Sequence, residues 1–66
     1  MKLRDYEQME VNKVYHFDNM EIAKDKDGEL YSHYPQFEEF WYPFSTNDMW
    51  FEKWKDRELI EGHFSY

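Results

Sequence analysis

Carboxylates and aromatic rings, the side chains here best suited to recognising another molecule, are concentrated in residues 27–52. This window holds nine rings, six carboxylates and no lysine or arginine, so it carries −6 of the chain's formal charge of −7. A negative field beside rigid rings suits the binding of a basic partner, because charge steers the encounter and buried rings slow dissociation. The acids are Asp27, Glu29, Glu38, Glu39, Asp48 and Glu52, and the rings are Tyr31, Tyr34, Phe37, Phe40, Trp41, Tyr42, Phe44, Trp50 and Phe51.

Catalytic chemistry finds little support in the sequence. The three histidines, His16, His33 and His63, accompany no nucleophile in a known motif. Glu38 and Glu39 are adjacent, so on a helix they would diverge by about 100°, which is unsuited to paired acid–base catalysis. We therefore expect no enzymatic activity and no catalytic residues. An activity would need a cleft in which a histidine meets a carboxylate.

Metal and cofactor binding are not expected either. The run from Asp25 to Gly28 is similar to part of an EF-hand loop, but the ligand positions 1 and 12 would fall on Ala23 and Tyr34, which cannot serve. His16 and Asp18 lack further clustered ligands, and the absence of cysteine removes thiolate zinc sites. It also favours a reducing, cytoplasmic setting.

The net charge restricts the possible partners. A charge of −7 disfavours direct contact with nucleic acid or an anionic membrane. Exposed rings can stack on single-stranded bases, but such sites pair them with a basic groove that this window lacks. No secretory signal is visible, and no apolar run approaches the roughly 20 residues that span a bilayer. The expected partner is a basic protein surface.

The elements that must position these side chains are predicted to form one small α+β domain over residues 1–66. Alternation predicts a strand over 9–17, and Asp-Gly between two β-prone runs predicts a hairpin over 20–34. Residues 58–66 alternate again, which favours a last strand over a helix extended to Glu61. We expect a small antiparallel sheet of three to four strands with one or two short helices.

Two short helical stretches are possible after Pro35. Proline suits a first helical turn, and the 3-4-7 spacing of four rings would place them on one helical face up to the break at Pro43. An irregular loop is the alternative. A second helix over about 47–57 would be capped within residues 45–48. The four rings are Phe37, Phe40, Trp41 and Phe44.

The apolar inventory predicts a core built from rings. Only seven residues are Leu, Ile or Val, whereas fifteen are aromatic. A domain of this size cannot enclose fifteen rings, so some should be exposed or covered by a partner or a second copy. Taken singly, five rings at helical spacing are more simply explained as core: Phe37, Phe40, Trp41, Trp50 and Trp54.

Chains that are small, acidic, cysteine-free and aromatic-rich resemble the proteins with which bacteriophages disable host enzymes, including DNA-mimicking inhibitors of restriction, CRISPR and uracil-DNA glycosylase proteins. Asp25, Asp27, Gly28, Tyr31 and Tyr34 are similar to the hairpin of a phage uracil-DNA glycosylase inhibitor, over about ten residues. The tryptophan-rich segment after Pro35 does not follow that family. The resemblance implies a role in counter-defence inside the host cytoplasm.

The sequence thus predicts a non-enzymatic inhibitor or regulator that binds a basic, nucleic-acid-handling host protein, with carboxylates standing in for DNA phosphates, which occur about every 1.7 Å along a duplex. The alternative is a homodimer or assembly subunit whose surplus rings are buried against a second copy. The predicted partner-binding residues are Glu38, Glu39, Trp41, Tyr42, Asp48, Trp50 and Glu52.

Overall fold

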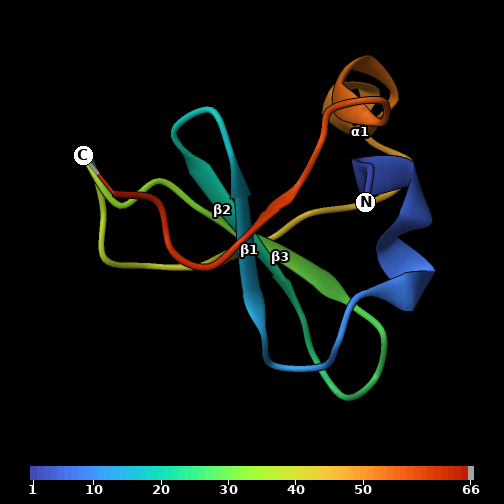
Figure 1. The fold of residues 1–66 in the computed structure, drawn as a ribbon, viewed down its shortest axis with the longest axis horizontal. Coiled ribbons are helices and arrows are strands. Elements are labelled where there is room, and N and C mark those ends of the chain that lie inside the picture. The colour runs from blue at the N-terminus through green and yellow to red at the C-terminus, as the bar shows by residue number, and fades with distance from the viewer. Residues whose placement is uncertain (66) are drawn as a thin grey trace.

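The computed structural model describes residues 1–65 and has the expected α+β architecture (Figure 1). Five strands form one antiparallel sheet in the order β4-β3-β2-β1-β5, and both edge strands are only two residues long. One 3₁₀-helix and one α-helix accompany the sheet. The elements are η1 (Leu3–Gln8), β1 (Val14–Phe17), β2 (Met20–Lys24), β3 (Leu30–His33), β4 (Tyr42–Pro43), α1 (Met49–Trp54) and β5 (Ile60–Glu61).

The predicted hairpin over 20–34 is confirmed as β2 and β3, with Ile22 opposite Ser32. Its turn is organised by Asp25, whose Oδ1 accepts hydrogen bonds from the backbone N–H groups of Asp27 and Glu29, both at 2.9 Å. Gly28 adopts φ +83°, which glycine reaches without steric cost. The residues resembling an EF-hand therefore form a turn.

The first strand is shorter than predicted. Residues 9–13 do not belong to it: Met9 ends η1, and Asn12 turns the chain at φ 61° before β1 begins at Val14. The interrupted alternation at Lys13 and Val14 marks this boundary. The last strand is shorter as well, since β5 pairs only Ile60 and Glu61 with β1. Tyr66, the end of the predicted strand, lies outside the described residues.

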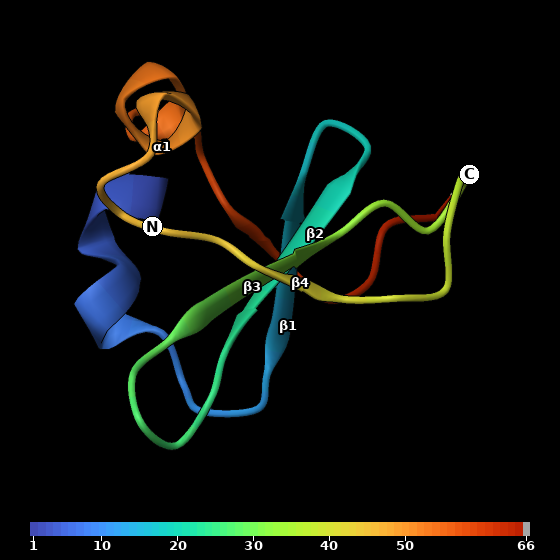
Figure 2. The ribbon, with the colours of Figure 1, turned by 180° about the vertical axis from the view of Figure 1, so that it is seen from behind.

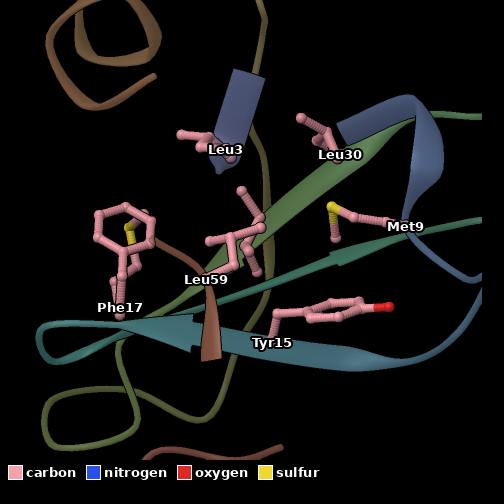
Figure 3. Close-up of a cluster of buried hydrophobic side chains, with 8 residues drawn as sticks. Leu3, Met9, Tyr15, Phe17, Leu30 and Leu59 are labelled. Carbon is pink, nitrogen blue, oxygen red and sulfur yellow. The ribbon is translucent and has the colours of Figure 1, made fainter. Parts of the chain in front are cut away.

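The core is mainly aliphatic, so the prediction of a core built from rings is wrong. Leucine, isoleucine and methionine supply six of its eight buried hydrophobic residues, and Tyr15 and Phe17 are the two rings. Four further rings pack around this cluster while partly exposed: Tyr6, Phe44, Phe51 and Trp54. Two methionines, flexible enough to fill irregular gaps, replace the rings that composition favoured. The aliphatic members are Leu3, Met9, Met20, Ile22, Leu30 and Leu59 (Figure 3).

The two helices and two of the irregular segments occupy opposite ends of the molecule. In Figures 1 and 2, α1 and η1 lie together at one end, whereas the segment between β3 and β4 and the C-terminal segment after β5 lie together at the other. Backbone hydrogen bonds join the N-terminal segment to the chain after α1, with Leu3 N–H donating to the Arg57 carbonyl at 3.0 Å. The sheet lies between these two ends.

Candidate partner-binding site

The acidic, aromatic window does not form one continuous surface. Its middle part, residues 34–42, connects β3 to β4 and lies beside the C-terminal segment of the chain (Figure 2). Asp48, Trp50 and Glu52 belong to the cap and body of α1 at the opposite end of the molecule. We call residues 34–42 the aromatic loop. The predicted site residues therefore fall into two groups with different surroundings.

The aromatic loop is a turn followed by irregular backbone. The Tyr34 carbonyl accepts hydrogen bonds from the N–H groups of Phe37 and Glu38, both at 3.0 Å, but this turn does not continue into a helix before β4. Phe37 is 73% exposed and Phe40 68% exposed, so the prediction of core positions for these two rings is wrong. The 3-4-7 spacing places rings at 37 and 40 on one face only if the segment is helical, and no helix forms between β3 and β4.

The acids of the aromatic loop have no basic neighbour. Within residues 1–65, neither Glu38 nor Glu39 forms an ion pair, and both are exposed. A hydrogen bond from the Tyr42 hydroxyl to the Glu38 carboxylate, reinforced by partial burial and the nearby charge, raises the pKa of Tyr42. The loop folds around a shallow open hollow lined by Pro35, Gln36, Phe37, Glu38, Glu39, Phe40 and Tyr42.

The acids at the α1 end already have partners within the chain. Asp48 is the N-cap of α1, and its Oδ1 accepts from the Trp50 N–H at 2.9 Å. Glu52 forms an ion pair with Lys55 at 2.6 Å. The cap lies within the predicted range 45–48, but the helix is shorter than the predicted 47–57. It ends at Trp54 and is followed by a tighter turn, in which the Arg57 N–H donates to the Trp54 carbonyl at 2.9 Å.

The rings at this end form an aromatic stack against the core. Trp50 stacks on Trp54 with ring centroids 5.0 Å apart, and Trp54 stacks in turn on Phe44 at 6.2 Å and meets Phe17 edge-on at 5.6 Å. The predicted core role of Trp54 is therefore confirmed. Trp50, 44% exposed, is the outer ring of the stack, and the Lys53 ammonium lies 4.8 Å from its centroid.

A polar cluster on the sheet was not predicted from the sequence. Register pairs His16 with Glu21 and Glu21 with His33, so these three side chains share the face opposite the core. Trp41, which directly precedes β4, stacks on His33 with centroids 4.9 Å apart. Alternation within each strand could have placed each residue on the outer face, but only strand pairing brings them into one row.

Glu21 is the centre of this cluster and is 2% exposed. Its Oε1 lies 2.7 Å from His33 Nδ1, and its Oε2 accepts from His63 Nδ1 at 2.9 Å and from the Phe64 N–H at 3.0 Å. Burial alone would raise the pKa of Glu21, but the hydrogen bonds from His33, His63 and Phe64 outweigh it and lower that pKa. Glu21 is thus an ionised carboxylate held by donors from two other parts of the chain.

The cluster meets only part of what catalysis requires. Two of the three histidines do meet a carboxylate, as an enzyme would need, yet Glu21 lies enclosed beneath them. The hollow of the aromatic loop and a second one, lined by residues 27–30 and 43–46 together with Tyr6, have other linings. Among residues 1–65, no group of three or more His, Cys, Asp or Glu side chains is placed to hold a metal ion. In the same part of the chain no helix has the length and apolar character to cross a membrane.

Compared with known proteins, the chain matches no protein-family model, no curated protein and no solved structure. The likeness to phage inhibitors therefore remains one of size and composition.

Proposed function

We propose that this protein is a non-enzymatic binding protein that docks through its aromatic loop onto a basic protein surface, and that its partner is a nucleic-acid-handling host protein. The observation that carries the proposal is the combination, in one short loop, of exposed rings with carboxylates that have no basic neighbour. Single exposed rings are common on protein surfaces, but several within one short loop are typical of a surface that binds a partner. The pairing of rings with unneutralised charge specifies a cationic partner.

The chemistry of the loop suits arginine better than lysine. A guanidinium can lie flat on an aromatic face while donating paired hydrogen bonds to a carboxylate, whereas an ammonium is a point charge that holds its water tightly. Phe37 and Phe40 supply the faces, and Glu38 and Glu39 supply the carboxylates. Arginine-rich surfaces are typical of proteins that bind nucleic acid, which links the loop to the DNA-mimicking role.

The two groups of predicted site residues have different weight in this proposal. Glu38, Glu39 and Tyr42 lie in the aromatic loop and contact the partner directly, while Trp41, stacked on His33, anchors the loop. Asp48 and Glu52 are engaged within α1, and Trp50 lies beside Lys53. The α1 group therefore contributes less to a basic partner's affinity.

The experiment is an affinity capture from host lysate at two salt concentrations with a charge-matched control. Glu38→Lys/Glu39→Lys reverses the charge of the loop, and Glu7→Lys/Glu29→Lys makes the same change in net charge at exposed acids outside it. A partner that fits is a nucleic-acid-binding protein, retained by the wild type and the control, lost with the loop variant, and displaced by excess duplex DNA. Retention unchanged by salt and by the loop variant would refute the proposal.

Self-association is the second candidate, because the exposed rings Phe37 and Phe40 could be buried against another copy. A net charge of −7 per chain opposes it, and two aromatic loops would bring four unpaired carboxylates together. Sedimentation at micromolar concentration separates the candidates. A monomer whose mass is unaffected by salt supports partner binding, and a dimer lost in Phe40→Ala supports self-association.

A further inference from the structure

We propose that His33 is a doubly protonated bridge between the sheet and the aromatic loop, so that the loop is ordered while His33 carries both ring protons and loosens when one is lost. This inference concerns regulation of the same surface and takes its biological meaning from the proposed function. Its physical content, an imidazolium that fixes a loop, can be tested on the isolated protein.

Two hydrogen-bond acceptors face the His33 ring. Nδ1 lies 2.7 Å from Glu21 Oε1, and Nε2 lies 2.7 Å from the Glu38 carbonyl oxygen. A backbone carbonyl can only accept, and an ionised carboxylate can only accept as well. A neutral imidazole has one N–H and would leave one of these contacts without a hydrogen. Both contacts are satisfied only when both ring nitrogens donate.

The other two histidines do not share this requirement. His63 uses Nδ1 for Glu21 and is otherwise 74% exposed, so its second nitrogen faces water. His16 uses Nδ1 for the Gly62 carbonyl at 2.8 Å, and no second acceptor contacts its ring within the described residues. A neutral tautomer protonated on Nδ1 satisfies either of them. The cluster therefore has one histidine that needs two protons, and two that need one.

The surroundings of His33 favour the imidazolium. Its low exposure of 13% opposes a charge, but the Glu21 carboxylate 2.7 Å from Nδ1 balances that charge, and the Trp41 ring stacks on the imidazole at 4.9 Å, where a cation gains from the aromatic face. The other titratable groups nearby are His16 and His63 on the far side of Glu21, and the Glu38 carboxylate, which is turned to the Tyr42 hydroxyl. No lysine or arginine forms an ion pair with Glu21.

Loss of one proton from His33 breaks one end of the bridge. The loop end gives way, because the Glu21 contact lies within the sheet register and the Glu38 carbonyl belongs to irregular backbone. The hydrogen bond from His33 to the Glu38 carbonyl therefore stabilises the loop at pH values where the imidazolium persists, and this stabilisation is lost as pH rises and the imidazolium loses a proton. Histidine titrates in the range where many cellular compartments differ in pH. The loop should therefore bind best on the acidic side of that titration.

Nitrogen-15 NMR of the imidazole rings tests the protonation state directly. In the wild-type protein, His33 is expected to show two protonated ring nitrogens under conditions where the Phe37 and Glu38 amides are protected from exchange. A single neutral tautomer of His33 under conditions where the loop amides are protected from exchange would overturn the proposal. The experiment needs no partner and no variant.

Amide exchange then tests the coupling to the loop. Protection factors of the Phe37 and Glu38 amides, corrected for intrinsic exchange, should fall about tenfold as His33 titrates, the loss expected from one hydrogen bond, while β1 and β2 amides stay constant. His33→Phe keeps a ring for Trp41 but no donor, so its loop should show the low protection at every pH. His63→Ala, the matched control, should keep the wild-type pH dependence. If His33→Phe retains that dependence, or if wild-type loop protection does not change with pH, the bridge does not control the loop.

The outcomes for bridge and partner are separable. If NMR and exchange show the bridge but no basic protein is captured, the proposed function fails and the bridge stands. If a basic partner is captured with an affinity independent of pH across the His33 titration, the function stands and its regulation by the bridge is refuted.

Discussion

The α1 end and the aromatic loop both come from the same acidic, aromatic window, yet their side chains are used differently. At the α1 end, Trp54 packs against Phe17 and Phe44. Asp48 caps the helix, and Glu52 forms an ion pair with Lys55. At the loop end, Phe40 is exposed and Glu39 has no polar partner among residues 1–65. Similar composition thus serves stability at one end and leaves a free surface at the other.

The contrast shows why composition alone is a poor locator of binding sites. A ring contributes to stability only if other groups cover it, and an acid contributes negative field only if no base neutralises it. Both conditions depend on neighbours supplied by distant parts of the chain. Lys53, Lys55 and the core reach the α1 end, whereas the aromatic loop is joined to the Glu21 cluster through His33.

The largest effect should come from Trp54→Ala at the α1 end. Removing this ring opens a cavity between Phe17 and Phe44, and such truncations cost about 3–5 kcal/mol. Urea denaturation would measure the loss, or circular dichroism would show an unfolded chain. Trp50→Ala, which removes only the outer ring of the stack, is the control. Equal losses for the two variants would show that the stack does not distinguish inner from outer rings.

Glu21→Ala should follow, because it leaves His33, His63 and the Phe64 N–H without their shared acceptor. Unsatisfied buried donors cost about 1–3 kcal/mol. The loop and the C-terminal segment should lose exchange protection together, since Glu21 joins both. Loss of protection across the whole sheet instead would mean that Glu21 holds the fold rather than this end of it.

Replacing an acid should lower stability more at the α1 end than in the aromatic loop. Asp48→Ala removes the N-cap of α1 and should lower the free energy of unfolding by about 1 kcal/mol. Glu39→Ala, which breaks no contact within the described residues, should leave stability within about 0.5 kcal/mol of the wild type. Thermal melts of the two variants side by side would measure the difference. A larger loss for Glu39→Ala would reverse the comparison.

Strong acid should weaken the contacts that Glu21 makes at the loop end. The folded-state pKa of Glu21 lies below its ordinary value of 4.5, so its contribution is present above about pH 4.5 and is lost as pH falls through the lowered value. The difference in unfolding free energy between the wild type and Glu21→Gln should therefore shrink in that range. A difference that grows on acidification would contradict the direction of the shift.

The smallest effect on stability is expected for Phe40→Ala. This ring is 68% exposed, so its removal should change stability by no more than about 0.5 kcal/mol while weakening partner binding. Denaturation and capture assays on the same preparation would separate the two effects. A stability loss comparable to that of Trp54→Ala would show that Phe40 is covered in solution.

Parts of the fold were predictable because their signals are local. The Asp-Gly turn fixed the β2–β3 hairpin, and a polar run before the tryptophans located the cap of α1. The first strand was overestimated because Met9 and Val11 extend the alternating pattern to the other side of the turn at Asn12, although Lys13 and Val14 interrupt it. The aromatic core was wrong because Met9 and Met20, absent from an inventory of Leu, Ile and Val, occupy the interior.

The sequence by itself determined the localised charge, the excess of rings and the α+β elements, since these depend on composition and on neighbours within a few residues. Only the tertiary structure decided that the window divides between two ends, and that Glu21, His33 and His63 meet, because strand register and chain reversal bring together residues up to 42 positions apart. Whether an acid is free or neutralised, and whether a histidine needs one proton or two, is set by those distant neighbours.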